Sequence, residues 1–281
     1  MTRALGRASL TMVNGGDIRL DGGAMHGVVP KTLWSKLVSC DEHNRCTYTT
    51  NCLLVELGGR RVLVEAGNGD KFPARMKEIF GIDHDRSIAV ALSEIGVEPD
   101  SIDVVVLTHL HFDHVGGCTR RAGDSVEPVF RRARHVVQRA ELDAALHPHE
   151  RNRASYLDEN LGPLLEAGLV EAVDGEVEVT PGVRVLPTPG HSRGHQSVLI
   201  DGGGERALFL GDVVPTSVHV RLPWTMAYDL DVEATLASKK GLYERALAED
   251  WLVLFGHDRR HGAHLARDPR GEVVAGPLVD L

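Results

Sequence analysis

Three histidines and one aspartate stand within a stretch of six residues, at His109, His111, Asp113 and His114. The apolar run 104–107 directly before them predicts a buried strand, and the pair Gly116 and Gly117 allows a tight exit from the loop. Four such side chains at one strand end would repel one another or be poorly solvated without a cation. Because imidazole and carboxylate ligands together suit zinc, iron or manganese, the pattern predicts a metal site.

Three further candidate ligands follow apolar runs later in the chain, at His191, Asp212 and His257. The runs that precede them, 183–186, 207–210 and 251–255, predict strands, so each candidate is expected on a loop at a strand end. Taken alone, each of these positions is weak evidence. Together with the first cluster they form a set of seven ligands, five His and two Asp, delivered from four strand ends.

The seven-residue pattern resembles the metallo-β-lactamase-fold superfamily of metal-dependent hydrolases, and the resemblance extends over nearly the whole chain. It implies two divalent metal ions, zinc first, although these ligands also accept iron, manganese and cobalt. In the dinuclear members of that superfamily the ligands divide into a first site, a second site and a bridging residue. The resemblance assigns His109, His111 and His191 to the first site, Asp113, His114 and His257 to the second, and Asp212 to the bridge.

Two further segments, 20–31 and 223–229, look like the quorum-quenching lactonase and methyl-parathion-hydrolase-like branch of this superfamily. One position departs from the branch, since the residue after Met25 is usually Phe there and is His26 here. This difference bears on the shape and polarity of the substrate pocket.

The order of apolar runs predicts two β-rich halves with helices between them, which implies an α/β (α+β) fold, a four-layer αββα sandwich. Strands are expected at 10–13, 17–20, 52–57, 62–65, 102–108, 134–138, 183–186, 197–200, 207–210 and 251–255. Helices are expected at 74–80, 87–95, 140–146 and 232–247, and a helical excursion within 147–175. No linker divides the chain, so 1–281 is expected to be a single domain.

The chain carries a net charge of −9 and has 42% hydrophobic residues, values ordinary for a globular protein. The acidic balance argues against nucleic acid as a partner and favours a small neutral ester, lactone or phosphotriester. The first 20 residues lack the apolar run of a signal peptide, and no run is long enough to span a membrane. We therefore expect a cytoplasmic protein, with a homodimer left open. We also expect reduced thiols at all four cysteines, Cys40, Cys46, Cys52 and Cys118.

The ligand set predicts hydrolysis by a hydroxide that bridges the two metals, with Asp113 and Asp212 orienting it or moving its proton. No Gly-x-Ser-x-Gly motif offers a serine nucleophile instead. Opening of a lactone, of the acyl-homoserine-lactone type, is the first hypothesis for the reaction. The alternatives are a phosphotriesterase or arylesterase at the same site, a thioesterase, a mononuclear-iron dioxygenase of the same fold, and a metal-binding protein without catalysis.

The loop after Asp212 supplies the expected substrate contacts, because it begins at the bridging ligand and is rich in aromatic and thioether groups. Tyr228 is also a candidate catalytic residue that donates a hydrogen bond to the substrate carbonyl. Supporting roles are expected for Thr108 beside His109, for Asp258 beside His257, and for His195. The expected substrate-contact residues are Met25, His26, His219, Trp224, Met226 and Tyr228, with Trp34 closing the pocket.

Overall fold

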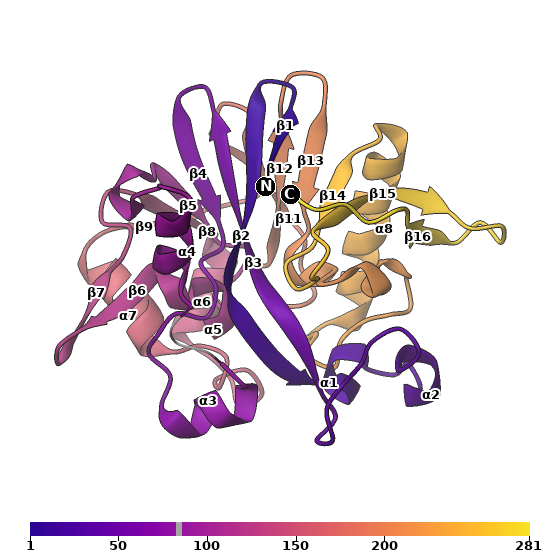
Figure 1. The fold of residues 1–281 in the computed structure, drawn as a ribbon, viewed down its shortest axis with the longest axis horizontal. Helices are drawn as coiled ribbons and strands as arrows, with labels where there is room; N and C mark the ends of the chain where they lie inside the picture. The colour runs from indigo at the N-terminus through magenta and orange to yellow at the C-terminus, as the bar shows by residue number, and fades with distance from the viewer. Residues whose placement is uncertain (83–85) are drawn as a thin grey trace.

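Two seven-stranded sheets form the centre of the computed structural model, which describes residues 1–82 and 86–281 (Figure 1). The first sheet has the order β1 (Thr2–Leu5), β2 (Ala8–Asp21), β3 (Arg45–Leu57), β4 (Arg60–Val64), β5 (Val104–Val106), β8 (Arg134–Gln138) and β9 (Val170–Val173). The second has the order β10 (Val177–Thr180), β11 (Val183–Pro187), β12 (Gln196–Asp201), β13 (Arg206–Phe209), β14 (Leu252–Leu254), β15 (Gly262–Arg267) and β16 (Val273–Ala275). The hairpin β6 (Thr119–Ala122) and β7 (Ser125–Pro128) stands apart.

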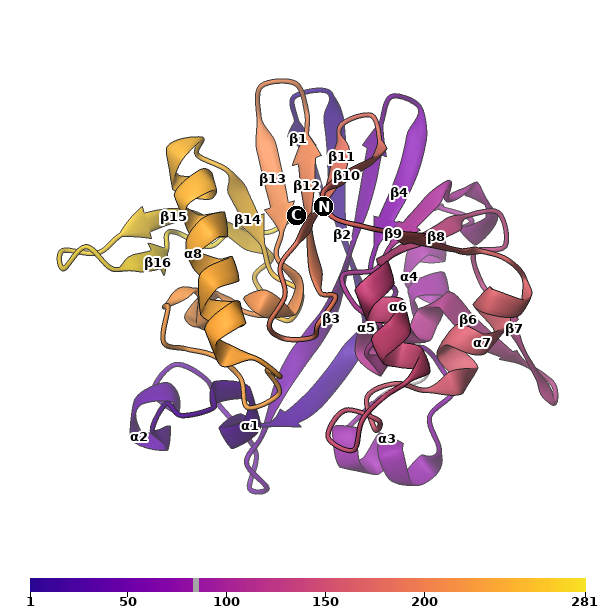
Figure 2. The same ribbon diagram turned by 180° about the vertical axis from the view of Figure 1, so that it is seen from behind.

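Helices cover the outer faces of both sheets, which completes the expected four-layer αββα sandwich (Figures 1 and 2). Outside the first sheet lie α4 (Ile88–Glu94), α5 (Phe112–Val115), α6 (Arg139–Leu146) and α7 (Asp158–Glu166). The longest helix, α8 (Val232–Ala248), packs outside the second sheet. Three short helices, α1 (Gly22–His26), α2 (Lys31–Trp34) and α3 (Ala74–Phe80), lie at one end of the sandwich.

The central strands read as continuous apolar runs because both of their faces are buried. On β3, Leu53 and Val55 face the second sheet, whereas Cys52 and Leu54 face the helices outside the first. The second sheet divides in the same way. On β13, Phe209 lies in the core between the sheets and Leu208 packs on the α8 side. This double burial fixes the strands, and therefore their ends, in place.

Most of the expected elements are present, although several bounds differ, the strand expected at 52–57 is Arg45–Leu57, and strands such as β1, β15 and β16 were not expected. The strands expected at 10–13 and 17–20 are one strand, β2, interrupted by a register shift between Asn14 and Asp17. Gly16 lies in this bulge with φ +122°, a conformation that favours glycine, so the pair Gly15–Gly16 marks a bulge and not a strand end. The strand expected at 102–108 is shorter, at Val104–Val106.

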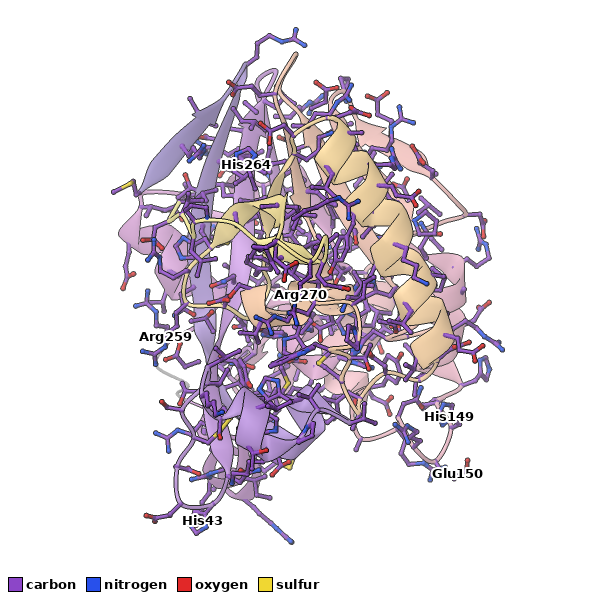
Figure 3. All side chains as sticks on the ribbon, turned by 90° about the vertical axis from the view of Figure 1, so that its right-hand side faces the viewer. His43, His149, Glu150, Arg259, His264 and Arg270 are labelled. Atoms are coloured by element: carbon purple, nitrogen blue, oxygen red, sulfur yellow. A yellow bond between two sulfur atoms is a disulfide. The ribbon has the colours of Figure 1, made fainter. Side chains whose placement is uncertain are left out.

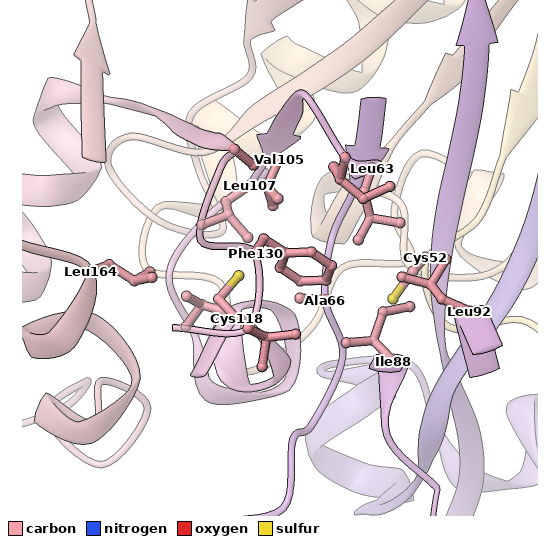
Figure 4. Close-up of a cluster of buried hydrophobic side chains, with 14 of the residues drawn as sticks. Cys52, Leu63, Ala66, Ile88, Leu92, Val105, Leu107, Cys118, Phe130 and Leu164 are labelled. Atoms are coloured by element: carbon pink, nitrogen blue, oxygen red, sulfur yellow. The ribbon is translucent and has the colours of Figure 1, made fainter. Parts of the chain in front are cut away.

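Cys40 and Cys46 form a disulfide bond, so the expectation of reduced thiols is wrong for this pair. The chain between them turns back on itself, and the two residues face each other in an antiparallel bridge with Cα atoms 4.0 Å apart. This proximity is a property of the turn that their spacing did not reveal. Cys52 and Cys118 are free and belong to the buried cluster around Phe130 (Figure 4).

None of the helices in the described part of the chain combines the length and the apolar character that crossing a bilayer requires.

Replacing Leu53 by Ala should lower the free energy of unfolding by about 2–5 kcal/mol, because the residue is fully buried between the sheets and leaves a cavity. The matched control is Leu33→Ala on α2, where the side chain is 51% exposed. Urea denaturation of both variants measures the difference. Equal losses would mean that the core between the sheets does not carry the stability assigned to it.

Candidate metal centre

Seven buried side chains of metal-ligand type meet at one end of the two sheets. All seven candidate ligands predicted from the sequence are among them. The first cluster follows β5, the next two residues follow β11 and β13, and the last follows β14. The set comprises His109, His111, Asp113, His114, His191, Asp212 and His257.

The side chains form three overlapping groups, within each of which the potential ligand atoms lie within 4.8 Å of one another. The groups are His109, His111 and His191, then His109, His114 and Asp212, and finally Asp113, His114 and His257.

Asp212 lies between the groups. Its Oδ2 is 3.4 Å from His191 Nε2 and 3.5 Å from His114 Nε2, and its Oδ1 is 3.1 Å from His257 Nε2. The His191 Nε2 atom is also 3.1 Å from His111 Nδ1. One carboxylate therefore reaches imidazoles from three different loops, a geometry that could serve two cations at once.

Electrostatics divide the cluster into neutral and charged members. Burial, followed by neighbouring imidazoles, lowers the pKa of His109 and His111 well below the usual value, which leaves both rings neutral. Burial also opposes protonation of His114, but nearby carboxylates, Asp212 first, outweigh it and raise its pKa. Burial likewise raises the pKa of Asp212, but His257 and His114 outweigh it and hold that pKa well below its usual value. The site therefore attracts positive charge.

The donor atoms fit a metal ion. Among the described residues, the buried Nε2 atom of His109 has no hydrogen-bond partner, although it lies in two of the three groups. An orphaned buried imidazole nitrogen is costly unless a cation or water satisfies it. Neutral imidazole and carboxylate donors at these distances are the ligands that zinc and similar divalent ions take.

Four of the histidines are held by a hydrogen bond at the other ring nitrogen, an arrangement typical of metal-binding imidazoles. His109 Nδ1 bonds the Thr108 hydroxyl (2.9 Å), which confirms the contact expected for Thr108. The remaining three partners are the Glu65 carboxylate for His114 (2.8 Å), the Asp229 carboxylate for His191 (3.0 Å) and the Thr49 carbonyl for His257 (2.8 Å).

The expectation that Asp258 orients His257 is wrong. The Asp258 carboxylate instead accepts hydrogen bonds from the backbone N–H and the hydroxyl of Ser217, and the Thr49 carbonyl takes the position at His257. The side chain of residue 258 points to the loop after Asp212, because strand β3 already fills the space beside the imidazole.

His195 has the supporting role expected of it. Its Nε2 accepts the backbone N–H of Asp212 (2.9 Å), and its Nδ1 bonds the Thr188 hydroxyl (2.8 Å). Burial lowers the pKa of His195 to about 3, so the ring is neutral and can accept. Gly211 has φ +61°, and a Cβ there would lie 2.6 Å from this Nε2 atom, so glycine is required before Asp212.

Other histidines lie outside the site. His43 and His149 are exposed on loops at the periphery of the molecule (Figure 3). His264, also labelled there, pairs with Asp250 at 2.9 Å on the surface.

An apolar cluster lies beside the metal-ligand loops. Its member Phe112 stands between His111 and Asp113 in the chain, so the cluster adjoins the candidate ligands. Met25, Trp224 and Met226, three of the expected substrate contacts, are buried members of it. The buried residues of this apolar cluster are Ile18, Met25, Trp34, Cys46, Tyr48, Phe72, Ile82, Phe112, Trp224 and Met226.

His26 and His219 are fully buried and stack on each other, with ring centroids 5.1 Å apart. His26 also stacks on Trp34 (4.8 Å), and His219 Nε2 bonds the Met25 carbonyl (2.8 Å). Burial lowers the pKa of His26 to about 4 and that of His219 to about 3. Both rings are therefore neutral. His26 packs against Trp34 of the apolar cluster, and His219 packs against His26.

Tyr228 differs from the other expected substrate contacts in being 38% exposed. Burial of part of the ring, together with the charges of Asp21 and Asp113, raises the pKa of Tyr228 to about 12. Its phenol therefore keeps its proton at neutral pH and can donate a hydrogen bond.

Lys239 of α8 is a buried side chain that fixes the loop carrying several of these groups, and burial lowers its pKa to about 7. Its ammonium donates to four backbone carbonyls, those of His219 (2.7 Å), Arg221 (2.9 Å), Leu222 (3.2 Å) and Trp224 (2.9 Å). The sequence offered no signal for this role, because Lys239 and its neighbour Lys240 both lie in a helix of mixed polarity.

Known proteins resemble this chain over most of its length. The family model of the metallo-beta-lactamase superfamily matches residues 47–257. The N-acyl homoserine lactonase of Bacillus thuringiensis is 34% identical over 179 residues, which is 63% of this chain and 63% of that protein, so the match spans less than two thirds of the relative.

Solved structures extend the likeness to the whole chain. The probable metal-dependent hydrolase from Staphylococcus aureus has a TM-score of 0.90 and 30% identity and covers 99% of both chains. An N-acyl homoserine lactone hydrolase with N-hexanoyl-L-homoserine bound at its catalytic metal centre has a TM-score of 0.70 and 27% identity and covers 91% of this chain and 95% of that one.

Replacing Lys239 by Met should lower the free energy of unfolding by at least about 3 kcal/mol, since each buried carbonyl left unsatisfied costs about 1–3 kcal/mol. The exposed neighbour gives a matched control, and Lys240→Met should change the same quantity by no more than about 0.5 kcal/mol. Thermal and urea denaturation of both variants supply the comparison. A Lys239→Met protein as stable as the control would show that the four contacts do not hold the loop.

Proposed function

This chain belongs to the metallo-β-lactamase superfamily, and from that membership we propose that it is a metal-dependent hydrolase that opens small neutral lactones of the acyl-homoserine-lactone type. The observation that carries the proposal is the set of three overlapping ligand groups, of which the first two share His109 and the last two share His114. Such overlap suits two divalent cations a few ångströms apart.

Two divalent cations held here would lower the pKa of a water molecule between them and polarise the carbonyl under attack. The chain's own residues prepare that reaction. Asp212, with its N–H fixed by His195, is placed to hold the attacking oxygen in line. The Asp113 carboxylate, 3.7 Å from His114 Nε2 and from His257 Nε2, is the second group that can accept its proton. Both are buried, so bulk water does not compete for their hydrogen bonds.

The apolar cluster supports a substrate with an acyl chain. Phe112, Met25, Trp224 and Met226 bring aromatic rings and thioethers next to the ligand loops, and such groups bury methylene groups well. The net charge of −9 also disfavours an anionic substrate. The curated relative is named for N-acyl homoserine lactones, and the solved hydrolase holds a product with a hexanoyl chain.

Tyr228 is the group that we assign to the substrate carbonyl. Its protonated phenol is partly exposed, and the charge of Asp113, one of the candidate ligands, contributes to its raised pKa. A neutral donor at this position would stabilise the negative charge that develops on oxygen during the attack.

Metal analysis combined with a substrate panel tests the proposal. Protein purified without added metal should contain two divalent ions per chain, and a chelator should abolish lactone opening. Asp212→Ala should lose both ions and nearly all activity, because the carboxylate contacts both sides of the site. Asp250→Ala, at an exposed pair, is the control and should retain both.

The panel distinguishes the competing reactions. Faster turnover of phosphotriesters, aryl esters or thioesters than of any lactone would overturn the substrate assignment while leaving the hydrolase intact. Oxygen uptake coupled to turnover, with one iron per chain, would replace hydrolysis by the dioxygenase reaction.

Tyr228→Phe should lower kcat for lactone opening by up to about 10²-fold, the cost of losing one donor to a developing oxyanion. Metal content should stay at the wild-type level, because the three ligand groups consist of histidines and aspartates without the phenol. Tyr243→Phe is the control, since that hydroxyl is buried without a hydrogen-bond partner among the described residues. Unchanged kcat in the Tyr228 variant would remove the tyrosine from the reaction.

A further inference from the structure

A further buried carboxylate, that of Glu141 on α6, lies beside the candidate metal centre. The residue has no exposed surface, and its two oxygens accept four hydrogen bonds. Oε1 accepts the backbone N–H of Leu110 (3.0 Å) and the hydroxyl of Tyr156 (3.0 Å). Oε2 accepts the hydroxyl of Ser192 (2.6 Å) and the backbone N–H of Gly194 (3.3 Å).

Three of these donors belong to the two loops that supply the three-histidine group. Leu110 stands between His109 and His111, and Ser192 directly follows His191. The ring of Tyr156 also packs edge-on against His111, with centroids 5.1 Å apart. One carboxylate therefore ties together all three members of the group His109, His111 and His191.

The contact between α6 and the second of these loops leaves no room for a side chain. A Cβ at Gly194 would lie 2.1 Å from the backbone nitrogen of Glu141. The loop after His191 therefore rests directly on the first turn of the helix, which gives the carboxylate a fixed distance to this loop.

The chemistry of the four contacts requires a carboxylate. All four partners donate, and only an ionised carboxyl group offers two oxygens that both accept. Glu141 has no ion pair with Lys, Arg or His in the described part of the chain, so neutral donors alone solvate its buried charge. Hydrogen bonds to an ionised acceptor are stronger than those between neutral groups. The four hydrogen bonds of Glu141, called the brace below, therefore hold their partners firmly.

Glu65 contacts the other part of the metal centre, the two groups that contain His114. It has φ +68°, a conformation uncommon outside glycine, at the end of β4. Its carboxylate accepts the backbone N–H of Thr108 (2.7 Å) and the Nδ1 proton of His114 (2.8 Å). His114 belongs to the two groups that include Asp212 or Asp113, and not to the three-histidine group.

We propose that Glu141 is the positioning residue of the three-histidine group, holding His109, His111 and His191 at metal-binding distance, whereas Glu65 does the same for the groups that contain His114. The inference rests on the proposed function, since it assumes that both parts of the centre bind a cation. Neither glutamate touches the substrate in this assignment, so each acts through the histidines.

Cobalt titration of the metal-free protein tests this division. The proteins are the wild type, Glu141→Gln and Glu65→Gln, with visible absorption and chelator competition reporting the affinity of each ion. His111→Ala and His257→Ala, which each remove a ligand from one side only, identify the spectrum of each site. Because glutamine presents an amide N–H₂ to two of the four donors, Glu141→Gln breaks the brace at constant volume.

Glu141→Gln should weaken the ion of the three-histidine group by about 10–100-fold and leave the other ion at wild-type affinity. Glu65→Gln should give the reverse pattern. Wild-type affinity for both ions in Glu141→Gln would overturn the proposal. An equal loss at both sites, together with a lower melting temperature of the metal-free protein, would also overturn it, by reducing Glu141 to a general structural role.

Tyr156→Phe removes one donor and keeps the carboxylate, so it serves if Glu141→Gln does not fold. It should weaken the same ion selectively but less, and an equal effect on both ions would contradict the proposal. Failure of the wild type itself to bind cobalt would overturn the proposed function, and this inference with it.

Discussion

The buried negative charge of Asp212 is the constraint on which the rest of the site depends. Its oxygens lie 3.1–3.5 Å from imidazole nitrogens of His114, His191 and His257, which come from three loops. A carboxylate held without water is costly unless positive charge faces it. The backbone before it is correspondingly specialised, because Gly211 takes a left-handed conformation so that the Asp212 N–H can reach His195. The glycine before Asp212, the hydrogen bond to its N–H and the imidazoles that face it thus all position the same carboxylate.

The sandwich supplies the rigidity that such a group needs. The strands β4, β5 and β8 run parallel, as do β13 and β14, so ligand-bearing loops of both sheets leave from the same end. Both faces of these strands are buried, and close-packed interiors resist displacement. The ligands therefore stand on fixed strand ends, where small errors of position would be most damaging to a metal centre.

The parts of this structure that are local in sequence were predictable, and the parts that depend on distant contacts were not. Apolar runs located the central strands, and all seven candidate ligands follow such runs and meet in space. By contrast, Glu65 lies 49 residues from His114, Asp229 lies 38 from His191, and Glu141 lies 51 from Ser192. No periodicity links the members of such a pair. Two local features were missed as well, the Cys40–Cys46 bond and the bulge in β2, because a spacing of six residues and a pair of glycines do not specify the geometry of a turn or a bulge.

The charges of these distant residues bear on the number of cations that the site can hold. Four buried carboxylates contact the ligand set: Asp113 and Asp212 within it, and Glu65 and Asp229 on the far nitrogens of His114 and His191. With neutral imidazoles, two divalent ions would balance those four negative charges, and a single ion would leave half of them buried without compensation. Glu141 stands outside this sum, because four neutral donors already solvate it. The arrangement of the acidic residues thus supports the proposed pair of cations by a route that does not use the distances between the ligands.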